Sequence, residues 1–83
     1  MGESDIPAVD PSRPEYVYVQ VADDIERKIK AGKLAPGAML AGERALAEEY
    51  GVALNTARGA VRLLRERGLV VTLPAKGTFV AKR

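Results

Sequence analysis

The sequence predicts a mainly α-helical domain that ends in a small β-hairpin, the architecture of a winged helix-turn-helix. Helical periodicity covers most of residues 16–67, and a glycine-containing break at residues 51–52 separates two of the helical stretches. After residue 68 the pattern changes to short β-branched runs joined by a turn. At 83 residues the chain has room for one domain of this size.

Two parts of the chain differ in composition. Residues 1–14 hold three prolines and little apolar periodicity, so we expect residues 1–15 to form a flexible tail whose acidic side chains are solvated. Residues 16–83 are expected to form the folded domain.

The first helix is predicted at residues 16–31. Apolar side chains recur there every four positions, which places them on one face of a helix: Val17, Val21, Ile25 and Ile29. Gly32 follows as a terminator, and Pro36-Gly37 forms a turn before Met39-Leu40, a candidate short strand.

The next two helices form the predicted helix-turn-helix. One spans about residues 43–50, and Gly51-Val52 interrupts it. The other runs from about residue 54 to 67 and is closed by Gly68. Two short helices joined by a three- to four-residue turn with glycine are typical of this motif.

The hairpin is predicted from two apolar runs, at residues 69–73 and 78–80, separated by a turn at residues 74–77. Leu69 and Phe79 are assigned to the core. This hairpin would be the wing.

Composition limits the possible functions. The chain has no cysteine and no histidine, which removes thiolate metal sites, the commonest metal ligand and the commonest general base. We find no nucleophile–base pair and no phosphate-cradling loop, so no enzyme activity, metal or cofactor is expected. No apolar run approaches the roughly 20 residues of a membrane span, and the first residues do not resemble a secretory signal. A cytoplasmic setting is therefore expected.

Charge is distributed unevenly along the chain. The net charge is only +2, but residues 1–50 carry −4 and residues 51–83 carry +6. A cation-rich half of a nearly neutral chain indicates a polyanionic partner bound by one face, although charge alone equally fits a solvated basic surface.

The third predicted helix separates into two faces at roughly 100° per residue. The buried stripe is predicted at Ala57, Ala60, Val61 and Leu64. The opposite face carries an amide, two guanidinium groups, a glycine that would permit close approach, and one carboxylate: Asn55, Arg58, Arg62, Gly59 and Glu66.

This polar face suits the major groove of double-stranded DNA. Arginine pairs bidentately with guanine, and asparagine does so with adenine. Thr56, on the flank, is placed to reach a phosphate or a thymine methyl. Phosphates would repel Glu66, so the helix is expected to enter the groove by its N-terminal half. The alternative is an ordinary solvated amphipathic helix.

Further DNA contacts are predicted outside this helix. Arg44 lies in the first turn of the preceding helix, where free N–H groups and the helix dipole attract a phosphate. Its alternative role is a surface ion pair with Glu48. Lys76 lies in the hairpin loop, where Gly77 lets the backbone turn, and can reach a minor groove or a phosphate.

Several stretches resemble the DNA-binding domain of the GntR family of bacterial transcription regulators. They cover about residues 16–80 in the family's order and spacing, at residues 18–25, 32–37, 43–47, 50–52, 56–58, 68–70 and 76–80. The resemblance implies a repressor that binds a short inverted-repeat operator as a homodimer, with DNA contacts at Arg44, Thr56, Arg58 and the wing around Lys76. Family members normally continue into a metabolite-binding, dimerising domain. The resemblance implies that this effector domain is absent from the chain, which would then be either an excised N-terminal fragment or a standalone small regulator.

The chain departs from the family pattern at several positions. Ala41-Gly42 replace the usual Pro-Ser and Ala45 is not acidic, so the capping box of the second helix is lost. Ala53 replaces a serine, which leaves the recognition helix without a side-chain N-cap. Leu54 stands where most members carry a base-contacting arginine, and Pro74-Ala75 should stiffen the wing tip.

A second hypothesis is a protein-interaction module without its own operator, because winged helices also serve as docking domains. A docking surface should be more apolar than the exposed face predicted for the third helix.

Overall fold

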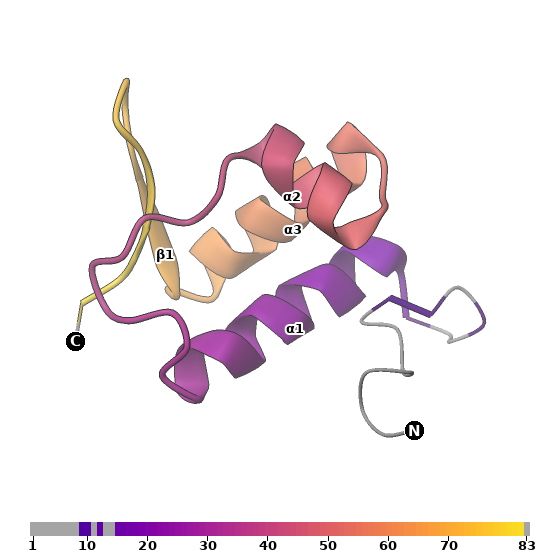
Figure 1. Ribbon diagram of the computed structural model, residues 1–83, viewed down its shortest axis with the longest axis horizontal. Coiled ribbons are helices and arrows are strands. Elements are labelled where there is room, and N and C mark those ends of the chain that lie inside the picture. The colour runs from indigo at the N-terminus through magenta and orange to yellow at the C-terminus, as the bar shows by residue number, and fades with distance from the viewer. Residues whose placement is uncertain (1–8, 11, 13–14, 83) are drawn as a thin grey trace.

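The computed structural model describes residues 9–10, 12 and 15–82 and has the predicted architecture (Figure 1). Three helices come first, α1 at Val17–Lys30, α2 at Glu43–Tyr50 and α3 at Leu54–Glu66. The antiparallel strands β1, Val70–Leu73, and β2, Gly77–Val80, follow them. In Figure 1 the hairpin stands at the opposite end of α1 from the start of that helix. The predicted fold class, helices plus wing, is confirmed.

Element boundaries differ from the predictions by about one residue. Arg67 is the C-cap of α3 rather than its last residue. Leu69 lies before β1 because its N–H bonds to the carbonyl of Leu64 and closes the helix. Met39 forms a single antiparallel bridge with Phe79, in the region where a short strand was predicted.

The core forms mainly where α1 packs against α3. The predicted stripe of α3 is confirmed, because Ala57, Ala60, Val61 and Leu64 are all buried. From α1, Val21, Ala22 and Ile25 enter the same cluster, whereas Val17 and Ile29 pack at its margin.

Leu69 is buried, as its assignment to the core requires, and Val80 is buried as well. Phe79 is only half-buried, so its assignment to the core is wrong. Successive side chains of a strand point to opposite faces. Since Val80 faces the core, its neighbour Phe79 faces outward and lines a shallow apolar groove with Val71 and Leu73.

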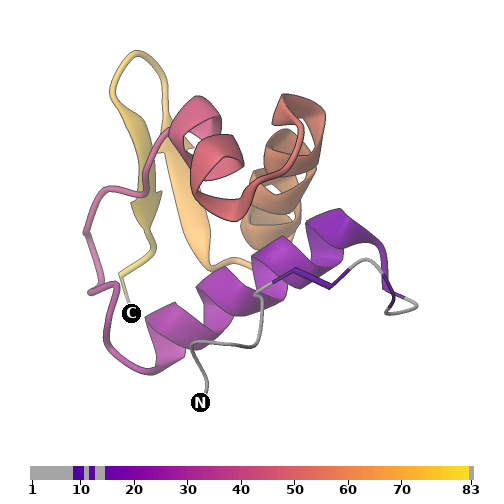
Figure 2. The ribbon, with the colours of Figure 1, turned by 45° about the vertical axis from the view of Figure 1, so that its right-hand side comes forward.

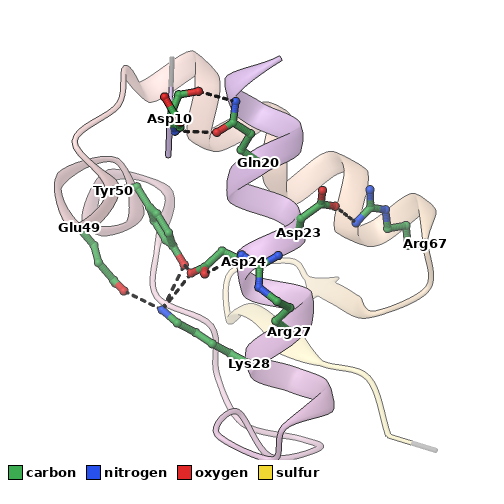
Figure 3. Close-up of polar contacts among 9 residues, drawn as sticks. All are labelled: Asp10, Gln20, Asp23, Asp24, Arg27, Lys28, Glu49, Tyr50 and Arg67. Carbon is green, nitrogen blue, oxygen red and sulfur yellow. Dashed lines mark hydrogen bonds and ion pairs between the residues drawn. The ribbon is translucent and has the colours of Figure 1, made fainter. Parts of the chain in front are cut away.

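The start of α1 is tied to the chain that precedes it. Gln20 is 1% exposed, and its side-chain amide bonds to the backbone N–H and carbonyl of Asp10 (Figure 3). The same amide also donates to the carbonyl of Glu15. Val9 packs against the core. The flexibility expected of residues 1–15 stays a prediction, since residues 1–8, 11 and 13–14 lie outside the described part.

Polar side chains of α1 also hold the other helices. The Tyr50 hydroxyl donates to Asp24 at 2.6 Å, and Lys28 Nζ donates to the Tyr50 oxygen at 3.2 Å (Figure 3). Burial and the hydrogen bond to Asp24 raise the pKa of Tyr50 to about 12. Arg67, the C-cap residue of α3, pairs with Asp23 and Glu26 of α1 at 2.9 and 2.7 Å. These contacts fix α2 and α3 on one scaffold.

Within the described residues, no helix is both long and apolar enough to span a bilayer.

Candidate nucleic-acid interface

A tight turn joins α2 to α3 (Figure 2). Gly51 has φ 66°, a left-handed conformation that glycine adopts without strain. Its N–H bonds to the carbonyl of Glu48, and the N–H of Val52 bonds to that of Ala47 at 2.9 Å, as in a Schellman motif. Val52 then packs on the core, which holds α3 at a set angle to α2.

Both helices of this motif begin without a side-chain cap, as predicted. Gly42 and Ala53 occupy the N-cap positions in extended conformation, and neither makes a side-chain hydrogen bond. The first-turn N–H groups of α2 and α3 therefore have no capping side chain. They remain available to water or to an anionic ligand.

The exposed face of α3 matches most of the prediction. Asn55, Arg58, Arg62 and Glu66 are all exposed, and Thr56 is half-buried on the flank. The amide and the guanidinium groups thus lie on the surface of the N-terminal two-thirds of the helix.

Gly59 has a different role from the predicted one. A Cβ atom at this position would lie 3.3 Å from Cβ and Cγ of Tyr18 on α1. The missing side chain therefore lets α1 pack closely against α3, and the idea that it opens the helix to DNA is wrong. Considering α3 as an isolated helix gave no indication of Tyr18.

Arg58 is held by an ion pair that sequence reasoning missed. Its Nε donates to Oε1 of Glu43, the first residue of α2, at 3.1 Å. The two residues are 15 positions apart and meet only because the turn brings α2 and α3 together, so no local spacing signals the pair.

Three predicted DNA-binding side chains carry uncompensated charge. Arg44, Arg62 and Lys76 are exposed, and none forms a hydrogen bond or ion pair through its side chain with another described residue. The alternative pairing of Arg44 with Glu48 is not formed.

The cations of α1 are paired with carboxylates, whereas Lys33 and Lys82 have no carboxylate partner among the described residues and Arg65 bonds to a threonine hydroxyl. On α1, Arg27 and Lys28 pair with Asp24, and Lys30 pairs with Glu26 at 2.8 Å. Arg67, at the end of α3, pairs with α1 as described above. The uncompensated guanidinium and ammonium groups of α2, α3 and the hairpin loop would attract a polyanion.

The hairpin loop presents Lys76 at its tip. The N–H of Lys76 bonds to the carbonyl of Leu73 at 3.0 Å, and Ala75 before it has φ 63°. Gly77 has φ 128°, which confirms that the turn uses its conformational freedom, and it lies beside the side chain of Met39.

Sequence reasoning also missed a link between α3 and the hairpin. Nη1 of Arg65 donates to Oγ1 of Thr72 at 3.0 Å, and that oxygen lies 3.0 Å from Oγ1 of Thr78. In the described part of the chain, no cluster of acidic side chains could hold a metal ion. The arrangement offers donors and positive charge to an anionic surface.

Comparison with known proteins agrees with this geometry. Residues 17–80 match the family described as bacterial regulatory proteins, gntR family. The chain is 38% identical over 69 residues to the HTH-type transcriptional repressor NagR of Bacillus subtilis. That match covers 83% of this chain but 28% of NagR, so the chain spans little more than a quarter of this relative.

Solved structures show the same architecture. YtrA from Sulfolobus acidocaldarius, a GntR-family transcription factor, superposes with a TM-score of 0.84 at 31% identity, over 90% of this chain and 79% of that one. AraR(DBD) in complex with operator ORX1 superposes with a TM-score of 0.76 at 32% identity, over 88% of this chain and 94% of that one.

Proposed function

The chain belongs to the GntR family of bacterial regulatory proteins, and from that premise we propose that it binds double-stranded DNA sequence-specifically and represses transcription. The observation that carries the proposal is the collection of uncompensated cations on the helix-turn-helix and the wing, while the cations of α1 are paired with carboxylates. Its relatives support it, since NagR is a transcriptional repressor and AraR(DBD) is bound to an operator.

In this proposal the N-terminal half of α3 reads bases in the major groove. The Nε of Arg58 is engaged by Glu43, which leaves its two terminal nitrogens to pair end-on with guanine O6 and N7. Asn55, the second residue of α3, is exposed and pairs with adenine. Arg62 extends the same face.

Contacts with the DNA phosphates would come from the residues around this reading face. Arg44 and the uncapped first turn of α2 bind one phosphate, and Thr56 binds another from the flank. At the wing tip, Lys76 and the backbone of Gly77 contact a phosphate or the minor groove. Glu66 lies where the helix leaves the DNA.

The assembly on DNA is also part of the proposal. Two copies would bind the halves of an inverted repeat, so that the two-fold symmetry of the operator matches that of a homodimer. The proposal includes a cytoplasmic location, because the DNA of bacteria lies in the cytoplasm. A regulatory rather than enzymatic role accords with the transcriptional regulators that it resembles.

The charge of α3 argues against the protein-interaction alternative. Its exposed face carries Asn55, Arg58 and Arg62 rather than apolar side chains, whereas a docking surface would bury apolar area.

The experiment is selection of bound sequences from random duplex DNA, followed by salt titration on the selected duplex. Enriched inverted repeats are expected. If Arg44, Arg58, Arg62 and Lys76 neutralise about four phosphates per monomer, log K should fall with log salt at a slope near −4 for each bound monomer (roughly −0.9 per phosphate).

Three variants sharpen this test. Arg58→Ala should relax base preference, whereas Lys76→Ala should weaken binding across sequences and reduce the slope by about 1. Lys30→Ala removes an equal charge on α1, where the ammonium pairs with Glu26, and should leave the slope unchanged. Binding without salt dependence, or without preference for any duplex, would overturn the proposal.

A further inference from the structure

The two edges of the hairpin are held in different ways. Along β2, the N–H of Leu40 bonds to the carbonyl of Thr78 at 2.7 Å, and the N–H of Val80 bonds to that of Ala38 at 2.8 Å. The backbone of residues 38–40 therefore runs beside β2 like a short third strand. In the described chain β1 has no such neighbour, because the sheet contains only β1 and β2.

Apolar packing holds only the base of the hairpin. Val70 and its cross-strand partner Val80 are buried, whereas residues 71–76 are all exposed. A two-stranded hairpin without a packed face is marginally stable in water. The backbone bonds to residues 38–40 support β2 as far as Thr78, so the half that carries Lys76 still needs a restraint on the β1 side to keep one orientation relative to α3.

The side chains of Arg65, Thr72 and Thr78 supply that restraint. Thr72 and Thr78 are directly opposite in the register, so their hydroxyls lie on the same face, the one that Arg65 reaches from the last turn of α3. Between this pair and the turn lies one further register pair, Leu73 and Gly77. The link therefore acts close to the tip.

From this geometry we propose that Arg65, Thr72 and Thr78 are positioning residues that hold the wing tip at a set distance from the reading face of α3. The inference rests on the proposed function and deepens it. When Lys76 and α3 belong to one rigid body, Lys76 can contact DNA once α3 is bound without a further loss of conformational entropy. If the tip moves freely, ordering it on DNA costs conformational entropy and weakens binding.

A competing explanation is that Arg65 itself binds a phosphate. Thr72→Val separates the two, because it removes the hydroxyl that Arg65 and Thr78 share and changes no charge. Valine has the shape of threonine and favours strands, so the fold is expected to remain. Thr72→Ser keeps the hydroxyl and should restore the wild-type behaviour.

The first measurement needs no DNA. Since the chain has no cysteine, Glu66→Cys and Lys76→Cys introduce two unique spin-label sites, one on α3 and one on the wing tip. The distance distribution between the labels should be narrow in the otherwise wild-type chain and with Thr72→Ser, and clearly broader with Thr72→Val. Equal widths for threonine and valine would overturn the proposal, whether or not the protein binds DNA.

The second measurement is a double-mutant cycle on the selected duplex. Thr72→Val and Lys76→Ala should each weaken binding by roughly 3- to 10-fold, the range expected for ordering one side chain, and the double variant should be no weaker than Lys76→Ala alone. Additive losses, or unchanged affinity of Thr72→Val, would overturn the proposal and favour direct phosphate binding by Arg65.

A control variant is available on the opposite face of the same strand. Val71→Thr changes an exposed side chain that does not face α3 and should keep wild-type affinity. Failure of the wild-type chain to bind any duplex would contradict the proposed function, while the label distances would still decide the positioning role.

Discussion

Arg58 and Glu43 form an ion pair across the helix-turn-helix, with Nε of Arg58 3.1 Å from Oε1 of Glu43. Both side chains are substantially exposed, at 54% and 41%, so the pair adds little to stability. Its effect is on orientation. A long side chain on the proposed reading face is held by a carboxylate from the preceding helix, and its terminal nitrogens stay free.

This pair leads to a prediction about specificity. Glu43→Gln removes a negative charge near the proposed phosphate positions and weakens the restraint on Arg58. Binding to random duplex should tighten by a few-fold, while the ratio of selected to random affinity should fall, because an unrestrained guanidinium loses more entropy when it pairs with guanine. Parallel titrations of both duplexes at one salt concentration measure that ratio.

Glu48→Gln is the matched control, since it removes the same charge on α2 at a side chain with no partner among the described residues. It should tighten both complexes equally. An unchanged ratio for Glu43→Gln would contradict the orienting role.

The missing cap of α3 gives a stability prediction. Ala53 has φ −68° and ψ 154°, the extended geometry that an N-cap residue adopts, but its side chain cannot accept a hydrogen bond. Ala53→Ser should raise the free energy of unfolding by about 0.5–2 kcal/mol. For a domain of this size the melting temperature rises by about 4–8 °C per kcal/mol, which calorimetry would detect.

Ala45→Ser provides the control, because it makes the same change at an exposed position inside α2. Serine is a poorer helix former than alanine, so this variant should lose a few tenths of a kcal/mol. A melting temperature for Ala53→Ser that is unchanged or lower would refute the missing-cap explanation.

The wing tip stores backbone strain at Ala75. Its φ of 63° makes it the only described non-glycine residue with positive φ. This conformation costs an L-residue about 1–2 kcal/mol, and glycine avoids that cost while adding chain entropy to the unfolded state. Ala75→Gly should therefore stabilise the domain by about 0.5–1 kcal/mol in urea unfolding.

Ala41→Gly makes the same substitution at a described position without positive φ, and it should destabilise the domain. If both variants lose stability equally, strain at Ala75 is not relieved by glycine.

The contact between Tyr50 and Asp24 predicts a pH dependence. Burial and the hydrogen bond to Asp24 raise the pKa of Tyr50 from its ordinary 10 to about 12. The folded state therefore holds this proton more tightly than the unfolded state. The resulting stabilisation is complete below pH 10 and is lost as the pH rises toward 12.

Tyr50→Phe isolates this contribution from the other groups that titrate in alkali. At pH 8 the variant should be less stable by about 1 kcal/mol, because it lacks the hydroxyl between Asp24 and Lys28. Urea midpoints of the two proteins should converge between pH 10 and 12. Curves that stay parallel over that range would contradict the predicted proton linkage.

The elements of the fold could be predicted because their signals are local. The buried stripe of α3 follows from helical spacing within one segment, and the turn at Gly51 follows from the freedom of a single residue to adopt positive φ. The lack of side-chain caps at Gly42 and Ala53 could also be predicted from local sequence, because an N-cap side chain bonds to N–H groups in the first turn of its own helix.

The surroundings of the candidate site could not be predicted in this way. Arg58 meets Glu43, Gly59 meets Tyr18, and Arg65 meets Thr72, each through contacts between different elements. Phe79 turns outward because the hairpin places Val80 against the core.

The sequence by itself thus determined the helices, the turns, the wing and the side chains that α3 exposes, since each depends on backbone preferences and periodicity over a few residues. Only the tertiary structure decided which of those side chains are held, covered or free. Their partners lie up to 44 positions away, as for Arg67 and Asp23, and are set by how the helices pack.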